Sequence, residues 1–482
     1  MPQAPVIVWF RYDLRLSDNP ALSKAAASGG PVICLYIREE TGTGQRAMGA
    51  AAAWWLAQSL RALMADLERL GQRLVLRSGK AAEVLAAMIA ETGAGSVVWN
   101  RRYDAGGIAT DKAIKSDLAA RGITAESFGA NLLREPWEVK SAVGEPMKVF
   151  TPFWRAHQRL GDIRAPLRAP TSLPAPAGPV ASETVEEWGL EPTRPNWAAG
   201  FTDHWTPGEA GAQARLEAFL AGSLDGYADG RDRPDRASTS RLSPHLRFGE
   251  ISPVQIWHRT HMVAGMEPGR DVSKFLAEVG WREFAYHLLF HFPHLPEANY
   301  QHRFDAFPWR ADAPALKAWQ KGLTGYPIVD AGLRELWQTG WMHNRVRMIV
   351  ASFLVKHLLI DWRAGEAWFW DTLVDADVAN NPASWQWVAG SGADAAPYFR
   401  IFNPMLQGEK FDPKGDYVRR WVPELAGLPA KAIHTPWEAP LAILHKAGVR
   451  LGETYPRPIV DHDAARARAL AAFATIREPS AA

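Results

Sequence analysis

Short apolar runs alternate with helical stretches over residues 5–130. The runs PVIVWFR, PVICLYI, RLVLRSG and SVVWNR are rich in β-branched and aromatic residues, and GITAESFG supplies a fifth. The stretch AAAAWWLAQSLRALMADLERLG, between the second and third runs, has the periodicity of a helix. Strands that alternate with helices predict a parallel sheet with crossover helices. We therefore expect an α/β N-terminal domain with a five-stranded, doubly wound parallel sheet.

The pattern changes after this first part of the chain. Residues 161–200 are rich in Pro and Ala and lack sustained periodicity, which is typical of a long connection over the surface. From about residue 205 the strand pattern disappears, and apolar residues recur at helical spacing between prolines. We expect an α/β domain at residues 1–130, an interdomain linker at 131–204 and an all-helical domain at 205–482.

Composition limits the kinds of partner and the cellular location that we expect for this chain. The 54 Lys and Arg residues nearly balance 52 Asp and Glu residues, so any basic surface that meets a polyanion must be local. The single cysteine, Cys34, cannot form an intrachain disulfide, and we expect it to fill the core. The N-terminus lacks the pattern of a signal peptide, and the apolar runs are too short to span a bilayer. These features predict a soluble, cytoplasmic protein.

Hydroxyl side chains gather before a predicted helix in GYADGRDRPDRASTSRLSPHLRFGEISP, residues 226–253. Thr239, Ser240 and Ser243 precede Pro244, a residue well suited to the first turn of a helix. Hydroxyls and free backbone N–H groups at a helix start suit a phosphate. The alternative is that Ser243 merely caps its helix.

Two further pairs have the spacing of one helix face. Asn344 and Met348 are four residues apart with Arg347 beside them, so on a helix they could line a pocket. The alternative is that Asn344 is a hydrogen-bonded interior amide and Met348 fills the core. Glu278 and Trp281 are three apart on a predicted helix, and a carboxylate against an indole is more often a rim contact than an acid site. The sequence has no HExxH, CxxC, GxSxG, GxGxxG or P-loop motif. We therefore expect no metal, and nothing specific indicates a hydrolase or a familiar nucleotide site.

The segment LVDADVANNPASWQWVAG, residues 373–390, places carboxylates and amides in an otherwise apolar stretch. Burying an amide without a partner costs roughly 1–3 kcal/mol. Asn380 and Asn381 must therefore have hydrogen-bond partners.

Six segments, in order along the chain, carry a family resemblance: VIVWFRYDLRLSDNPAL, TSRLSPHLRFGEISP, WREFAYHLL, TGYPIVDAGLRELWQTGWMHNRVRM, LLIDWRAGE and DADVANNPASWQWVAGSGADAAPYFRIFNP. They resemble the DNA photolyase/cryptochrome family, and bacterial cyclobutane pyrimidine dimer photolyases most of all. The resemblance implies an α/β antenna domain, a long linker and a helical domain that holds FAD.

The activity implied by the resemblance is light-dependent DNA repair. A deoxyribodipyrimidine photo-lyase, a carbon–carbon lyase, uses photoexcited reduced FAD to pass an electron to a cyclobutane dimer, which splits and returns it. The flavin supplies the reactivity, and the protein supplies position and electrostatics. The partner is UV-damaged DNA, and we expect a monomer. The alternative is a cryptochrome-like blue-light photoreceptor. Such receptors often carry a long C-terminal extension, whereas only a short stretch follows the last predicted helix here, so we favour the enzyme.

The resemblance also implies the residues that bind FAD, with Arg347 and Asp375 paired. Asn381 would face flavin N5, where its carbonyl accepts the N–H of the reduced ring without adding negative charge. Relatives with Asp at this place tend toward signalling, so an Asn favours repair. The FAD-binding residues expected are Tyr227, Thr239, Ser240, Arg241, Leu242, Ser243, Arg282, Asn344, Arg347, Asp375, Asp377 and Asn381.

Three tryptophans, Trp385, Trp362 and Trp309, match the chain through which this family passes electrons from the surface to a photoexcited flavin. Indoles suit this role because they can be oxidised and can be buried without ionising. The alternative for each is a core aromatic. With Asn381 and Glu278, these tryptophans form the expected catalytic set.

Lesion choice follows from the residues that would surround the damaged bases. Photolyases that repair (6-4) photoproducts carry histidines where this chain has Asn344 and Met348, neither of which can protonate a substrate. We therefore expect a pocket for a flipped cyclobutane dimer. The residues expected at the lesion and the flanking DNA are Arg231, Glu278, Trp281, Arg282, Asn344, Arg345, Met348, Trp387, Gln407 and Lys410.

The antenna chromophore is the last inference from the resemblance. AAAAWWLAQSL is similar to members that bind methenyltetrahydrofolate, which we therefore favour. Asp104 stands where several folate-binding relatives have Glu, and this departure leaves a deazaflavin or an empty site open.

Overall fold

The computed structural model describes residues 3–39, 46–265, 269–395 and 399–476. By proximity of the backbone the chain forms two compact units. The first comprises residues 1–225 and 240–293, and the second comprises residues 226–239 and 294–482. The domain boundaries expected at residues 130 and 204 stay a prediction.

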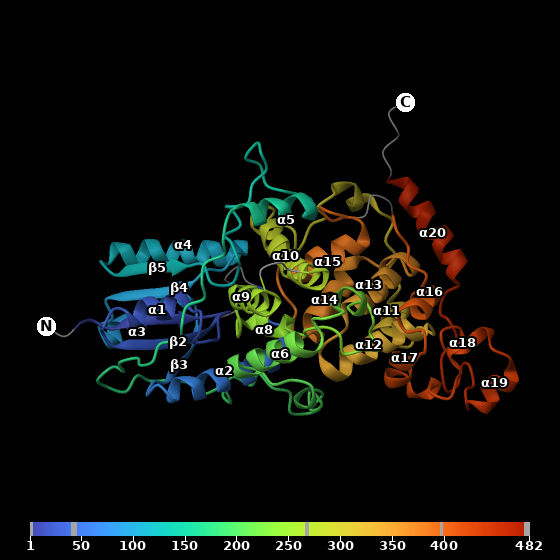
Figure 1. Ribbon diagram of the computed structural model, residues 1–482, viewed down its shortest axis with the longest axis horizontal. Helices are drawn as coiled ribbons and strands as arrows, with labels where there is room; N and C mark the ends of the chain where they lie inside the picture. Colours follow the sequence, from blue (N-terminus) through green and yellow to red (C-terminus); the bar gives the residue numbers. More distant parts are fainter. Residues whose placement is uncertain (1–2, 40–45, 266–268, 396–398, 477–482) are drawn as a thin grey trace. The chain divides into compact units, whose positions relative to one another are not determined.

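A five-stranded parallel sheet forms the N-terminal part of the first unit (Figure 1). Its strands lie in the order β3-β2-β1-β4-β5, and each neighbouring pair is parallel. The strands are β1 (Val6–Phe10), β2 (Val32–Glu39), β3 (Leu74–Gly79), β4 (Ser96–Asn100) and β5 (Thr124–Phe128). The chain reverses its direction of progress between β1 and β4, as in a doubly wound sheet. The predicted sheet, with its fifth strand, is confirmed.

Helices between the strands cover the sheet and bury its side chains. They are α1 (Pro20–Ala26), α2 (Ala50–Glu68), α3 (Ala81–Thr92) and α4 (Ala105–Ala120). At the centre Trp9 of β1 packs edge-on against Trp99 of β4, with ring centroids 5.8 Å apart. Cys34 of β2 is fully buried, and burial raises the pKa of its thiol to about 12. The cysteine is therefore a core residue, as predicted.

The remainder of the first unit is helical. The Pro-rich stretch after α5 is irregular apart from turns and one short 3-10 helix, η1 (Phe201–Asp203). The helices of this part are α5 (Phe150–Arg159), α6 (Glu209–Gly222), α8 (Ser243–Phe248), α9 (Pro253–Ala264) and α10 (Arg270–His291).

The second unit is built from helices around one large apolar core. In the described part of this unit β-pairing is limited to one isolated bridge, Leu451 to Tyr455. Its core holds fully buried aromatic residues such as Trp319, Phe353 and Trp362. The principal helices are α7 (Tyr227–Gly230), α11 (Ala313–Gln320), α12 (Pro327–Thr339), α13 (Asn344–Ser352), α14 (Trp362–Thr372), α15 (Asn380–Ala389), α16 (Pro404–Phe411), α17 (Asp416–Trp421) and α20 (His462–Thr475). The predicted all-helical C-terminal part is confirmed.

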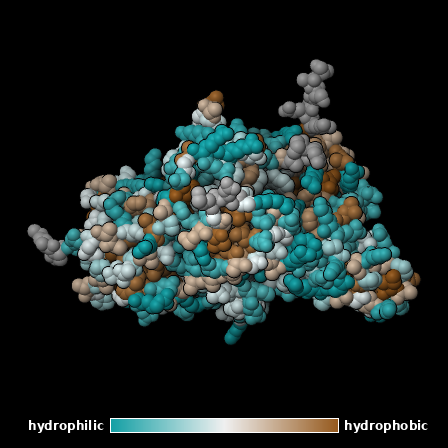
Figure 2. All heavy atoms as spheres, viewed as in Figure 1, coloured by the Kyte–Doolittle hydropathy of each residue, from teal (hydrophilic) through white to brown (hydrophobic). Residues whose placement is uncertain are grey.

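The surface is mixed in character. On the face drawn in Figure 2, hydrophilic residues are interspersed with small hydrophobic patches. Within the described ranges, no helix has both the length and the apolar content needed to cross a membrane.

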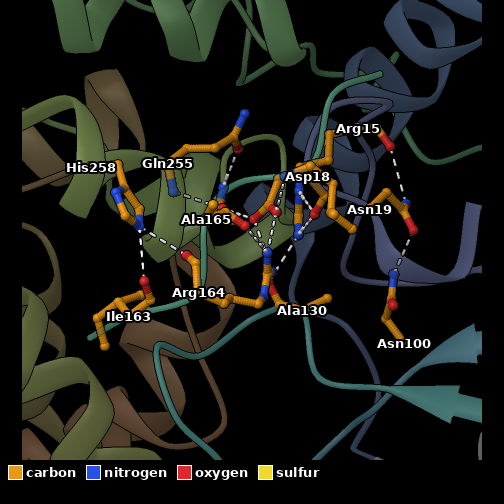
Figure 3. Close-up of polar contacts among 12 residues, drawn as sticks. Arg15, Asp18, Asn19, Asn100, Ala130, Ile163, Arg164, Ala165, Gln255 and His258 are labelled. Atoms are coloured by element: carbon orange, nitrogen blue, oxygen red, sulfur yellow. Dashed lines mark hydrogen bonds and ion pairs between the residues drawn. The ribbon is translucent and has the colours of Figure 1, made fainter. Parts of the chain in front are cut away.

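A buried carboxylate, Asp18, joins three segments of the first unit (Figure 3). Its Oδ1 accepts hydrogen bonds from Arg164 Nη1 at 2.5 Å and from the Leu167 N–H at 3.0 Å. Its Oδ2 accepts from Arg164 Nη2 at 3.1 Å and from Ser252 Oγ at 2.5 Å. Ser252 in turn caps α9 by accepting from the Gln255 N–H at 3.0 Å. Asp18 therefore fixes the loop after β1, the connection after α5 and the start of α9 to one another.

Arg15 holds the other side of the same loop (Figure 3). Its fully buried guanidinium donates to the carbonyl oxygens of Asp18 at 2.8 Å, Ala130 at 2.9 Å and Gly249 at 2.8 Å. Asp18 has a φ of 50°, a left-handed conformation that aspartate adopts more readily than most residues. The sequence RLSDN therefore makes this turn without a glycine.

We predict that Asp18→Ala lowers the free energy of unfolding of the first unit by about 2–4 kcal/mol, because several charge-assisted hydrogen bonds are lost together. Chemical denaturation followed by circular dichroism measures the loss. Glu186→Gln, which breaks the exposed pair with Arg61, is the control and should leave stability nearly unchanged. Equal effects of the two substitutions would contradict the central role of Asp18.

Candidate functional site

An ion pair in the second unit joins α13 to the loop before α15. Arg347 Nη1 and Nη2 lie 3.1 and 2.8 Å from the two carboxylate oxygens of Asp375, in a bidentate arrangement. Arg347 Nε also donates to the Met342 carbonyl at 2.7 Å, which fixes the plane of the guanidinium. The side chain of Asp375 is 2% exposed, whereas that of Arg347 is 24% exposed. The expected pairing of these residues is therefore present, and its cation remains accessible.

The amide of Asn381 is held by a residue that sequence analysis missed. Asn381 Nδ2 donates to Glu366 Oε1 at 2.8 Å and to the Glu366 carbonyl at 3.1 Å. Both groups are buried, on the adjacent helices α15 and α14. With its N–H groups engaged in this way, Asn381 turns its Oδ1 away from Glu366, so that an acceptor remains for another partner. Glu366 stood in the segment LLIDWRAGE, but only the fold reveals its contact.

Asp377 organises the start of α15. Its Oδ1 accepts from the N–H groups of Ala379 at 2.9 Å and Asn380 at 2.7 Å, and from Asn380 Nδ2 at 2.9 Å. These bonds satisfy backbone donors that a helix leaves free at its first turn. Asn380 and Asn381 thus both have the hydrogen-bond partners that their sequence setting required.

The three predicted electron-transfer tryptophans differ in exposure. Trp385 of α15 is 2% exposed, Trp362 at the start of α14 is fully buried, and Trp309 is half-buried. Trp385 lies directly against α14, because a Cβ on Gly365 would come within 2.1 Å of its ring. Trp309 packs against Phe307, with ring centroids 4.4 Å apart. The trio therefore consists of two core residues and one residue with partial solvent contact.

Two of the expected DNA-contacting arginines share one carboxylate in the second unit. Arg345 Nη2 lies 2.7 Å from Asp232 Oδ2, and Arg231 Nε lies 3.8 Å from Asp232 Oδ1. The guanidinium of Arg345 also lies 4.5 Å above the ring of Phe411. Lys410 contacts the same ring, with Nζ 5.2 Å from its centroid, and Gln407 lies on the same helix, α16. The cationic cluster is thus assembled around Asp232 and Phe411, neither of which sequence analysis identified.

The expected lesion residues of the second unit lie on α13 and α15. Asn344 is exposed as the first residue of α13, so it is not a satisfied interior amide. Met348 and Trp387 are half-buried and pack against the edge of the large core. The neighbouring His343 is buried, and burial lowers the pKa of its ring to about 4. It is therefore neutral at pH 7, and no protonated histidine stands beside Asn344.

The segment before α8, which we expect to bind the cofactor, contains one residue in an uncommon backbone conformation. Arg241 has a φ of 52°, and its guanidinium lies 4.8 Å above the ring of Trp205. Ser243 is the first residue of α8, and the capping position is taken by Leu242 without a side-chain capping bond. The alternative that Ser243 merely caps its helix is therefore wrong. Tyr227 is buried at the start of α7, where Arg231 lies over its ring.

The helix α10 carries the remaining expected residues of the first unit. Glu278 Oε1 lies 3.3 Å from Lys274 Nζ, one helical turn away. Trp281 stacks on Phe150, with ring centroids 3.8 Å apart and an interplanar angle of 10°. Arg282 Nη1 donates to the Asn131 carbonyl at 2.6 Å. Trp281 and Arg282 are thus both held by residues from outside their own helix.

A buried carboxylate lies next to these residues on α10. Glu283 Oε2 accepts from the backbone N–H of Leu133 at 2.8 Å and of Arg134 at 3.4 Å. His157 Nε2 is 4.0 Å away, and burial lowers the pKa of that histidine to about 3. Burial is also the main cause that raises the pKa of Glu283 to about 8.

Two family models match this chain. The model described as DNA photolyase matches residues 6–177, and the model described as the FAD binding domain of DNA photolyase matches residues 275–475. Together they cover the parallel sheet, most of α10 and the helices from α11 to α20.

Proteins of known name match nearly the whole chain. A deoxyribodipyrimidine photo-lyase of Agrobacterium fabrum is 59% identical over 98% of this chain and 98% of its own length. Cryptochrome-1 of Arabidopsis thaliana is 42% identical over 96% of this chain and 69% of its own length. The crystal structure of a class III photolyase from Agrobacterium tumefaciens superposes with a TM-score of 0.96 at 58% identity, covering 99% of both chains.

We predict that Glu283→Gln changes the pH dependence of stability. A carboxylic acid whose pKa rises on folding stabilises the protein at low pH, and this stabilisation is lost as the pH rises toward 8. The stability of Glu283→Gln relative to the unsubstituted chain should therefore increase between pH 5 and pH 8. Thermal unfolding at several pH values measures this change, and the exposed Glu138→Gln serves as the control. An unchanged pH profile would show that Glu283 ionises normally.

Proposed function

Because this chain belongs to the DNA photolyase/cryptochrome family, we propose that it repairs UV-damaged DNA in light, by electron transfer from reduced FAD to cyclobutane pyrimidine dimers. The observation that carries this proposal is the amide of Asn381, whose Nδ2 is held by Glu366, which leaves its Oδ1 as an acceptor. An acceptor without negative charge suits a reduced, electron-rich flavin.

The residues expected at the cofactor have the chemistry that FAD requires. Hydroxyls of Thr239, Ser240 and Ser243 and the guanidinium of Arg241 suit its diphosphate. Arg347, held by Asp375, offers an accessible cation to the flavin ring system. FAD, when bound, supplies light absorption and the electron transfer to the lesion, which protein side chains do not supply. The protein's part is to bind, to orient and to exclude water.

The choice of the cyclobutane dimer rests on the residues expected to meet the lesion. Splitting that dimer needs an electron and hydrogen bonds, whereas repair of the (6-4) lesion also needs a proton donor. Asn344 and Met348 cannot donate a proton to a base, and His343 is neutral because it is buried. Glu278 would hydrogen-bond the dimer, and Trp281, Arg282 and Trp387 would line the pocket.

DNA binding would use the cationic cluster around Asp232 and Phe411. Phosphates on either side of the lesion would be contacted by Arg231, Arg345, Gln407 and Lys410. We therefore expect the affinity for DNA to fall as the salt concentration rises. Lys410 and Arg345 share the ring of Phe411, which supports a single contact surface within the second unit. We propose that the protein acts as a monomer in the cytoplasm.

For the antenna chromophore we propose methenyltetrahydrofolate, on the resemblance of AAAAWWLAQSL alone. Its two tryptophans are buried, Trp54 beside Phe201 at 5.2 Å and Trp55 beside Trp205 at 5.4 Å. Asp104 caps α4 by accepting from the Gly107 N–H at 2.7 Å.

A cryptochrome-like photoreceptor is the competing function, and the 42% identity to Cryptochrome-1 of Arabidopsis thaliana is the observation that favours it. A receptor would change its shape or partners in light without turnover of a DNA lesion. Turnover of damaged oligonucleotides separates the two.

We predict that the reduced, FAD-loaded protein splits cyclobutane dimers under blue or near-ultraviolet light and leaves (6-4) photoproducts unchanged. Oligonucleotides that carry one lesion each, incubated in light and in darkness, give the measurement. Glu278→Ala should lower the repair yield while FAD stays bound, because its carboxylate is expected to face the substrate. Repair of the (6-4) lesion, or dimer loss in darkness, would contradict the assignment.

We predict that Trp385→Phe nearly abolishes photoreduction of oxidised FAD but leaves repair by the chemically pre-reduced protein largely intact. The tryptophans supply electrons to the flavin, whereas the lesion takes its electron from the flavin directly. Absorption spectra recorded during illumination and a separate repair assay test each part. Equal loss of both activities would contradict this division of roles.

A further inference from the structure

The indole nitrogen of Trp362 begins a short chain of hydrogen bonds within the second unit. Trp362 Nε1 donates to Asn299 Oδ1 at 2.9 Å. Asn299 Nδ2 donates in turn to Asp305 Oδ1 at 2.7 Å. Trp362 and Asn299 are buried, whereas the side chain of Asp305 is 56% exposed. The chain therefore links a buried indole to a carboxylate at the surface.

The amide in the middle of this chain is held firmly in place. Gln386, which is fully buried next to Trp385, donates to the carbonyls of Leu295 at 2.7 Å and Ala298 at 2.9 Å. Its Oε1 accepts from the Tyr300 N–H at 2.8 Å. Gln386 thus holds the backbone on both sides of Asn299, and the hydrogen bonds of the Asn299 amide to Trp362 and Asp305 set which way its oxygen faces.

Charges around Trp362 affect how easily an electron is removed from its ring. The guanidinium of Arg363 lies 4.7 Å from the Trp362 ring centroid, and a cation so placed opposes the removal of an electron from the ring. Arg363 is paired with Asp361 at 3.0 Å, and His302 lies 3.4 Å from Asp305. Asp305 is the carboxylate that reaches the indole through hydrogen bonds, and hydrogen bonds in such a chain polarise one another.

We propose that Asn299 and Asp305 are positioning residues that stabilise the positive charge on Trp362 while it relays an electron between Trp309 and Trp385. This inference rests on the proposed electron-transfer role of the three tryptophans. Oxidation of an indole makes its N–H a stronger donor, so a polarised acceptor stabilises the oxidised form more than the neutral form.

The electrons of this step balance between the three tryptophans and an external thiol. Oxidised Trp385 takes one electron from Trp362, which restores Trp385 and leaves one positive charge on Trp362. Trp309 then gives one electron to Trp362, and an external thiolate gives one electron to oxidised Trp309 and leaves as a thiyl radical. The oxygen of Asn299 is an amide acceptor and not a base, so the indole proton stays on Trp362 throughout.

The first test needs no bound cofactor. In protein with 15N-labelled indoles, the Trp362 N–H resonance is the one that Trp362→Phe removes. Asp305→Asn should shift this proton upfield because the hydrogen bond weakens, and Asn299→Ala should shift it further. An unchanged Trp362 resonance in Asp305→Asn would overturn the proposal.

The second test measures photoreduction of the FAD-loaded protein with excess thiol. Asp305→Asn should slow photoreduction about two- to threefold at low salt, and the difference should shrink as salt screens an exposed charge. In the Asn299→Ala background the Asp305→Asn change should have no further effect, because the coupling is broken. Glu453→Gln, which removes an exposed carboxylate paired with Arg450, is the control and should not change the rate.

The outcomes separate this inference from the proposed function. If Trp362→Phe retains normal photoreduction, the electron-transfer chain itself is wrong. If Trp362→Phe abolishes photoreduction but Asp305→Asn matches Glu453→Gln at every salt concentration, the chain stands and the role of Asn299 and Asp305 is overturned.

Discussion

The first unit depends on the buried carboxylate of Asp18. Three segments far apart in sequence meet at its two oxygens, and one of them, through Ser252, is the start of α9. The short helix α8 and the preceding segment with Arg241 lead directly into α9, so their path is set at its far end by this carboxylate. A loop after a sheet strand thus helps to fix the helical segment expected to bind the diphosphate.

In the second unit, buried polar groups are satisfied in pairs that also shape the site. Asp375 balances the charge of Arg347 and leaves the guanidinium accessible. Glu366 holds the Asn381 amide through its nitrogen and leaves the amide oxygen free. Gln386 fixes the segment around Asn299 by donating hydrogen bonds to its backbone carbonyls. Each pair removes the cost of burying polar atoms, and each leaves one group oriented for another partner.

Periodicity predicted the five strands and the helical second half, because these depend on residues that are neighbours in sequence. The sequence also showed that Asn381 needs a hydrogen-bond partner. It did not identify Glu366 as that partner, because the two residues meet only when α14 packs on α15. Asp232 and Arg345 are separated by 113 positions, which no local pattern relates. The same limit explains why the sequence left open whether Ser243 caps its helix and whether Asn344 is an interior amide, until exposure and contacts were known.

Cys34 has a practical consequence. It is fully buried in β2, and its thiol keeps its proton at neutral pH. A cysteine introduced on the surface, for example on α16 or α20, would therefore be the sole thiol open to a maleimide dye or spin label. Distances to the tryptophans or to damaged DNA could then be measured in the otherwise unaltered protein.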